Sequence, residues 1–296
     1  MAIRITSAER DGTFWTQAQA LATVLARDPL LTPVEVLESP GASVETAERL
    51  ADGAAELGFM AANWVPRAAH GAPPFTRALE IRTVAPMNAG PLFFIVRADA
   101  AIGNVADLAG KRVVFGPEKS GMAQHARLIF GLLGIETMPL HLDFATGGEA
   151  VASGGADAQL QCPIPNRVMT ELSERVAIRV LPYGAGQLER LLATVPYYRR
   201  ALMRQGALRG LDRDMAQIGV LNLLVASPRV GDAAVAAVAG AVAANAAELA
   251  RLNPLFDGLD GLLRELPVRG EAALAAGGVA LHPGAAQAYR TLGLLR

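Results

Sequence analysis

The stretch IRITSAERDGTFWTQAQALATVLARDPLLTPVEVLESPGASVETAERLADGAAELGFM, residues 3–60, alternates short β-rich runs with segments of helical periodicity. The order is strand 3–6, helix 13–26, strand 34–37, helix 44–51 and strand 57–60. The connections are short and rich in Gly, Pro and Ser, as is typical of right-handed crossovers between parallel strands. This β-α-β-α-β order predicts an α/β fold with a doubly wound, mostly parallel sheet.

A second unit of the same kind follows the extended run 91–97. Its predicted elements are strand 112–115, helix 122–133, strand 140–142, helix 148–152, strand 158–161, helix 166–174 and strand 178–181. A further extended run at 218–225 precedes a helix at 230–252. We expect the two extended runs to cross between two lobes. Residues 1–90 with 216–296 then form lobe I, and residues 91–215 form lobe II.

The composition fits a globular protein of about two domains. The chain has 296 residues, a mass of 30.9 kDa and 52% hydrophobic residues, so it can bury a large core. Its 27 basic and 28 acidic residues give a net charge of -1, and we expect no nucleic-acid partner because such a balance offers no field for a polyanion. The longest apolar stretch, 233–244, is shorter than the roughly 20 residues of a membrane-spanning helix.

The sequence contains none of the common catalytic or cofactor motifs. We find no H-E-x-x-H, G-x-S-x-G, G-x-x-x-x-G-K-[ST], G-x-G-x-x-G or C-x-x-C. Cys162 is the single cysteine, which excludes an intrachain disulfide and a multi-cysteine metal site. The candidate catalytic pair is Cys162 with His125 or His141, yet we expect these histidines, like His70 and His282, to be surface or locally hydrogen-bonded residues. We therefore expect no enzyme, no cofactor and no metal site.

Three strand-to-helix turns offer exposed backbone donors instead. They are residues 10–15, 116–122 and 162–166. In an open α/β sheet such turns line the crevice at the carboxyl ends of the strands, and the unpaired N–H groups of a helix start favour an anion. Three such turns at one cleft predict a carboxylate or phosphate ligand. The alternative is that Gly, Pro and Ser occupy these turns only because the backbone requires them.

The linear pattern resembles the TAXI family of solute receptors, the substrate-binding components of one class of TRAP transporters. The similarity runs over nearly the whole chain and is carried by these segments: Gly12-Thr13-Phe14, residues 94–99 and 105–113, the turn from Gly116-Pro117 to Ser120-Gly121, Val195-Pro196-Tyr197-Tyr198, and Leu281-His282-Pro283-Gly284-Ala285. The resemblance implies a two-lobed type II binding-protein fold that closes on a small ligand by hinge bending. It also implies amino acids or dicarboxylates as ligands and a membrane subunit as partner.

This chain departs from the family at the turns. It has Ser120-Gly121-Met122 where the family has Ser-Gly-Thr, so one hydroxyl donor is missing. Residues 61–64, Ala-Ala-Asn-Trp, place bulkier side chains where the family has a polar Gln/Ser pair. Asp11 adds a negative charge near the cleft. A more apolar or neutral solute than glutamate therefore stays open. An apolar wall with a few orienting polar groups is typical of small-molecule pockets.

The predicted ligand-binding residues come from these turns and from the first crossing strand. They are Gly12, Thr13, Phe14, Asn63, Trp64, Met87, Asn88, Lys119, Ser120, Gly121, Met122, Cys162, Pro163 and Asn166. The aromatic members have a second interpretation, because aromatic residues at helix starts are more often part of the core. We expect Tyr197 and Tyr198 to be packing residues. We also expect Pro283 to open a terminal helix that runs to Thr291.

The leading hypothesis is a periplasmic, monomeric receptor that delivers a small organic acid or amino acid to the membrane subunits of a TRAP transporter. Met1 leads directly into the first predicted strand without an export signal, so a mature chain or a cytoplasmic protein fits the sequence. The alternative is a cytoplasmic ligand-sensing or regulatory protein on the same fold. The arginines at 199, 200, 204, 209 and 213 predict either a docking face for the membrane partner or a solvated charged face.

Overall fold

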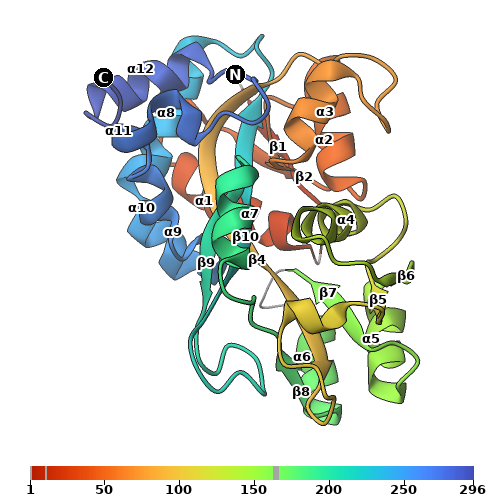
Figure 1. The fold of residues 1–296 in the computed structure, drawn as a ribbon. Helices are drawn as coiled ribbons and strands as arrows, with labels where there is room; N and C mark the ends of the chain where they lie inside the picture. The colour runs from red at the N-terminus through yellow and green to blue at the C-terminus, as the bar shows by residue number, and fades with distance from the viewer. Residues whose placement is uncertain (1, 11, 163–166) are drawn as a thin grey trace. The chain divides into compact units, whose positions relative to one another are not determined.

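The computed structural model describes residues 2–10, 12–162 and 167–296 and confirms the α/β class (Figure 1). The chain divides into two compact units. Unit 1 is Met1–Asn88 with Leu221–Arg296, and unit 2 is Ala89–Val220. Strands β4 (Arg82–Arg97) and β10 (Met215–Ala226) each contribute residues to both units. Both strands are longer than the extended runs predicted for them, 91–97 and 218–225.

The sheet of unit 1 has the predicted β-α-β-α-β order. It contains β1 (Ile3–Thr6), α1 (Thr13–Leu25), β2 (Val34–Leu37), α2 (Ala42–Asp52) and β3 (Leu57–Ala61). β1 pairs in parallel with β2 and with β3, and Ile5 lies opposite both Val36 and Leu57. The unit 1 part of β10 adds antiparallel to β3, with Asn222 opposite Ala61. The carboxyl ends of β1 and β3 therefore lie at one edge of this sheet.

The C-terminal helices of unit 1 correct one prediction. The segment 230–252 is two helices, α8 (Asp232–Ala244) and α9 (Ala246–Leu252), which meet at a bend of 74°. Asn245 ends α8 with φ -115° and ψ 20°, and its Nδ2 donates to the Ala241 carbonyl oxygen over 2.8 Å, beside the helical bond from its own backbone N–H to the same oxygen. Among the described residues, no single helix is long and apolar enough to cross a membrane.

The remaining elements of unit 1 are short. They are α3 (Trp64–His70), η2 (Pro254–Phe256), α10 (Leu259–Leu263), α11 (Leu266–Arg269), η3 (Gly270–Ala273) and α12 (Pro283–Thr291). α12 begins at Pro283 and ends at Thr291, as predicted, and the Nδ1 of His282 accepts from the Gly284 N–H over 3.2 Å. α3 was not predicted.

Unit 2 is also an α/β unit. Its elements are η1 (Val105–Leu108), β5 (Arg112–Val114), α4 (Gly121–Leu133), β6 (Met138–Leu140), α5 (Phe144–Ser153), β7 (Ala158–Gln161), α6 (Arg167–Arg175), β8 (Ile178–Val180), α7 (Gln187–Thr194) and β9 (Tyr198–Met203). β5 pairs in parallel with β6 and β7. β4 pairs antiparallel with β7 and β8, and β9 pairs antiparallel with the unit 2 part of β10.

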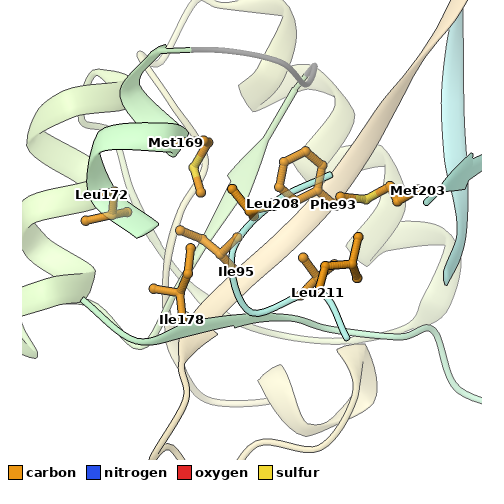
Figure 2. Close-up of a cluster of buried hydrophobic side chains, with 9 residues drawn as sticks. Phe93, Ile95, Met169, Leu172, Ile178, Met203, Leu208 and Leu211 are labelled. Atoms are coloured by element: carbon orange, nitrogen blue, oxygen red, sulfur yellow. The ribbon is translucent and has the colours of Figure 1, made fainter. Parts of the chain in front are cut away.

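A buried apolar cluster ties the loop between β9 and β10 to the rest of unit 2 (Figure 2). It combines side chains of β4, α6, β8, β9 and this loop, namely Phe93, Ile95, Met169, Leu172, Ile178, Val180, Met203, Leu208 and Leu211. The arginine-rich stretch 199–213 is thus not simply a solvated charged face. It contains β9, in which the side chain of Arg199 is buried and its guanidinium donates to the Pro196 and Tyr198 carbonyl oxygens.

Candidate functional site

The first predicted turn is shaped by Gly12 at the N-terminus of α1. Gly12 is the N-cap residue, with φ -76° and ψ 153°, and its N–H donates to the Glu9 carbonyl oxygen over 2.8 Å. A Cβ atom at Gly12 would lie 2.9 Å from the Cβ of Ala8, so a larger residue needs the backbone to move. Because Gly12 has no side chain to cap the helix, the first-turn N–H groups that begin at Thr13 keep their donor capacity.

The aromatic side chain of this turn packs within unit 1. The rings of Phe14 and Phe59 lie 5.7 Å apart between centroids, so the start of α1 rests on β3. The guanidinium of Arg10 lies 5.5 Å from the ring centre of Trp15, which covers the outside of the turn. Phe14 is half-buried and keeps part of its surface free for a ligand.

Asn63 is the least satisfied polar residue of the predicted site. It follows β3 and is the N-cap residue of α3, yet its side chain makes no capping bond. The residue is 6% exposed, and neither its Oδ1 nor its Nδ2 has a hydrogen-bond partner. A buried carboxamide without partners is uncommon because losing its water contacts destabilises the fold by about 1–3 kcal/mol. The Asn63 carboxamide can therefore bond to a ligand without breaking a hydrogen bond within the protein.

The neighbouring predicted residues are held by packing and by one amide pair. Trp64 is 9% exposed and lies edge-on to Phe75, with ring centroids 6.5 Å apart. Met87 is fully buried in β4. The next residue, Asn88, is buried and accepts at Oδ1 from the Nδ2 of Asn222 over 2.9 Å. The structure thus gives Trp64 and Met87 a place in the core, whereas Asn88 belongs to a satisfied hydrogen bond.

The second predicted turn precedes α4 in unit 2. Ser120 is the N-cap residue and its Oγ accepts from the Ala123 N–H over 3.1 Å. The N–H groups of Gly121 and Met122 remain as first-turn donors, because helix geometry gives them no acceptor. Met122 is buried, and Lys119 is exposed beside the turn.

The third predicted turn is described only at Cys162. Pro163 and Asn166, like Asp11 of the first turn, lie outside the described residues. Cys162 is partly exposed, but burial of its thiol raises the pKa to about 12, so it stays protonated at neutral pH. The histidines considered as its partners bond elsewhere: Nδ1 of His141 is 3.2 Å from the Gly116 carbonyl oxygen, and Nδ1 of His125 is bonded to Tyr198.

A polar aromatic cluster in unit 2 joins residues that are distant in sequence. Nδ1 of His125 lies 2.9 Å from the hydroxyl oxygen of Tyr198, and the two rings are 5.6 Å apart. The ring of Tyr197 meets both of these rings edge-on. Burial lowers the pKa of His125 to about 4, so the imidazole is neutral at neutral pH. The hydroxyl of Tyr183 is buried without a hydrogen-bond partner.

Neutral groups dominate the buried polar residues of both units. Among the described side chains that are buried, Arg199 is the only Lys, Arg, Asp or Glu. No group of three or more His, Cys, Asp or Glu residues in the described part of the chain could hold a metal ion. The remaining groups are helix N–H donors, carboxamides, hydroxyls and the imidazoles of His125 and His282. They can bind a small molecule through hydrogen bonds.

A comparison with protein families shows to which family the chain belongs. A family model described as the NMT1-like family matches residues 5–293. The chain belongs to the NMT1-like family. Three solved structures share the fold of this NMT1-like protein at TM-scores above 0.5.

The first of these is a sulfonate-binding protein SsuA from Methylobacillus flagellatus KT, with a TM-score of 0.59 and 12% identity over 99% of this chain and 95% of that chain. The second is a TctC solute-binding protein from Polaromonas, with a TM-score of 0.57 and 17% identity over 88% of each chain. The third is the aliphatic sulphonate-binding protein SsuA from Escherichia coli, with a TM-score of 0.52 and 18% identity over 100% of this chain and 84% of that chain. They confirm the predicted two-lobed type II fold.

The NMT1-like chain contains functional candidates that the sequence analysis missed. His125 was expected to be a surface or locally bonded residue, but its partner Tyr198 is 73 positions away. The prediction that Tyr198 is a packing residue is confirmed, since it is 2% exposed. Gln161, at the end of β7, is buried with an unpartnered Nε2. The alternation of Gln159 and Gln161 with Ala158 and Leu160 in a strand that is buried throughout was a signal for it in the sequence.

Proposed function

We propose that this protein is a non-catalytic solute receptor that captures a small organic acid or amino acid between its two units and delivers it to a TRAP-type membrane transporter. Membership of the NMT1-like family and the two-lobed fold support a binding role. Two strands, β4 and β10, connect the units, and a hinge at these strands would let the units close on a ligand. In this role the protein works in the periplasm as a monomer.

The observation that carries the proposal is the unpartnered carboxamide of Asn63. Its Oδ1 and Nδ2 have no protein partner although the residue is nine-tenths buried. A carboxylate oxygen of the ligand would satisfy Nδ2, and a hydroxyl or N–H group of the same ligand would satisfy Oδ1. The start of α1 follows β1, the strand next to β3, and brings its N–H donors to the same edge of the unit 1 sheet.

Within this proposal an organic acid fits better than an amino acid. The described residues of the predicted site contain no Asp or Glu, so they supply no carboxylate for the ammonium group of an amino acid. They do supply donors for an anion, namely the first-turn N–H groups of α1 and α4, the helices that begin at Thr13 and Gly121. The dipole of each helix adds about 0.3–1 kcal/mol for an anion at an exposed helix start.

The test is a thermal-shift screen of ligand-free protein with benzoate, succinate, taurine, glutamate and glutamine, followed by calorimetric titration of each hit. A ligand at 100 times its Kd stabilises the fold by about 2.7 kcal/mol, which raises the melting temperature by roughly 5 °C or more. We expect Asn63→Leu to bind a hit at least about tenfold more weakly. The matched control is Gln19→Leu, which replaces an exposed amide of α1 and should bind as the wild type does.

Two results would contradict the proposal. The first is the absence of any shift when the sample is folded and free of co-purified small molecules by mass spectrometry. The second is full affinity of Asn63→Leu for every hit, which would place the ligand elsewhere. Delivery is tested separately, by reconstituting uptake with purified TRAP membrane subunits and the loaded receptor.

A further inference from the structure

Unit 2 contains a groove that shares no residue with the predicted solute site. It has a volume of 690 Å³ and lies beside β8, the end of α6 and the loop between β9 and β10. Four arginines line it, Arg175, Arg179, Arg209 and Arg213, and we call it the arginine groove. Its acidic lining residues are Glu174 and Asp212, so arginines outnumber carboxylates two to one.

The groove is built on a fixed part of the unit. The loop between β9 and β10 is anchored by Leu208 and Leu211, which lie in the buried cluster with Ile178 (Figure 2). Between these two leucines, Gly210 has φ +92°, and a Cβ atom there would overlap the carbonyl oxygen of Ile178. The loop therefore packs directly on β8, and the groove exists before any partner arrives.

Three of the four guanidiniums have no carboxylate partner among the described residues. Arg175 pairs with Glu149, whereas Arg179 donates to the Ala100 carbonyl oxygen over 2.6 Å. Arg209 donates to the Glu174 carbonyl oxygen over 3.3 Å. A carbonyl oxygen orients a guanidinium but leaves its full charge in place. Arg213 is exposed, and no ion pair joins it to another described side chain.

One side of the groove is formed by the edge of β8. β8 pairs with β4 so that Val180 lies opposite Ile95, and the flanking bond runs from the Leu181 N–H to the Phe94 carbonyl oxygen. In an antiparallel pair the bonds alternate, so the N–H and C=O of Val180 point away from β4. Val180 lines the groove. Val180 is only 3% exposed and Gly210 packs against the Ile178 carbonyl oxygen, so this edge shapes the groove while the arginines provide its exposed binding groups.

We propose that the arginine groove binds an acidic, extended segment of a partner protein. Carboxylates of the segment pair with the guanidiniums of Arg209 and Arg213, which offer forked donors that fit a carboxylate. Apolar side chains of the segment, alternating with the acidic ones, face the apolar lining around Met215. In the proposed function, the protein partner that presents such a segment is the membrane subunit.

The test measures the fluorescence anisotropy of a labelled peptide, Glu-Val-Glu-Val-Glu-Val-Glu, with the full-length protein at low salt. We expect saturable binding that weakens as NaCl rises to about 0.3 M, because exposed charges are then screened. The double variant Arg209→Gln with Arg213→Gln should bind at least about tenfold more weakly. Arg190→Gln, which replaces an exposed arginine of α7 in the same unit, is the matched control and should bind normally.

Two further arms keep the proposal open to refutation. Arg213→Gln alone changes an exposed side chain, so we expect the variant to stay folded, and its circular dichroism checks that a loss of peptide binding does not come from unfolding. A peptide with Gln in place of every Glu should not bind. Equal binding of both peptides, equal binding by the double variant, or displacement of the peptide by citrate at equal charge concentration would overturn the proposal. The last result would identify a small-anion site instead.

Discussion

The hydroxyl oxygen of Tyr198 lies 2.9 Å from Nδ1 of His125 in the interior of unit 2. The bond joins β9 to α4, and Tyr197 packs edge-on against both rings. Burial lowers the pKa of the imidazole to about 4 and raises the pKa of the phenol above its ordinary value of 10. Both groups are therefore neutral at neutral pH, and each satisfies the other.

The buried imidazole makes the stability of the protein depend on pH. The pKa of His125 is about 4 in the folded protein and 6.5 in the unfolded chain, so the unfolded chain binds more protons below pH 6.5. The contribution of the neutral His125 imidazole to the free energy of unfolding is fully present above pH 6.5 and is lost as the pH falls toward 4. Between pH 7.5 and pH 5 this group should lower the free energy of unfolding by about 2 kcal/mol. Urea unfolding at both pH values measures this change in the free energy of unfolding. If a His125→Gln variant shows the same change, the prediction is wrong.

Removing the hydroxyl of Tyr198 should destabilise the fold. Tyr198→Phe leaves Nδ1 of His125 buried without a partner, which lowers the free energy of unfolding by about 1–2 kcal/mol at pH 7.5. Chemical denaturation measures the change. In the His125→Phe background the same substitution should have a much smaller effect, since the bond is already absent. Equal effects in both backgrounds would mean that the hydroxyl acts elsewhere.

Two buried asparagines of unit 1 should respond with opposite signs. Asn63→Leu removes a carboxamide without partners and should raise the free energy of unfolding of the ligand-free protein by about 1 kcal/mol. Asn88→Leu breaks the bond to Asn222 and should lower it by about 1 kcal/mol. Thermal and urea unfolding of the two variants form a matched pair. Destabilisation by Asn63→Leu would indicate a structural role for that side chain.

Gly210 should not tolerate a side chain. Gly210→Ala places a Cβ atom against the carbonyl oxygen of Ile178 at φ +92°, and we expect a loss of about 2–4 kcal/mol in the free energy of unfolding. Gly206 is the control, because it lies in the same loop at φ +77° with open space around it. Gly206→Ala should therefore lose only about 1 kcal/mol. Similar losses in both variants would show that the packing on β8 is unimportant.

Cys162 should be unreactive in the folded protein. With its pKa raised to about 12 by burial, the thiol is almost entirely protonated at pH 8, whereas an unfolded cysteine has a pKa near 8.5. Iodoacetamide at pH 8 should label the native protein very slowly and the urea-unfolded protein completely. Mass spectrometry of the two samples reads out the labelling. Native labelling at the rate of a free cysteine would contradict the raised pKa, since Cys162 itself is partly exposed.

Local patterns were sufficient to predict much of the fold. The β-α-β-α-β order of residues 3–60 and the start of α12 at Pro283 depend on periodicity and on turn residues, which are properties of short segments. β9 was missed because Arg199 and Arg200 made its sequence look like a solvated face. In the structure Arg199 is buried and Arg200 pairs with Glu189, so the strand forms despite its charges.

The candidate site was less predictable because its properties come from contacts between distant segments. The sequence placed Asn63 at a strand end, but only the structure reveals that the side chain neither caps α3 nor finds another partner. Likewise, nothing near His125 in the sequence indicates Tyr198. For Trp64 the sequence predicted a ligand contact, whereas in the structure its ring packs on Phe75, eleven residues further along the chain.

The division of the chain between the two units has a consequence for its synthesis on the ribosome. Unit 2 is one continuous segment, Ala89–Val220, so all of its strands and helices have been translated once Val220 is added. Synthesis of unit 1 begins before that of unit 2 and ends after it. The edge of β3 stays unpaired until the β10 residues from Leu221 onward have been translated. The nascent unit 1 therefore exposes an unpaired edge of β3 while unit 2 is made. During this interval we expect a chaperone to bind the nascent chain near β3, where the unpaired strand edge is exposed.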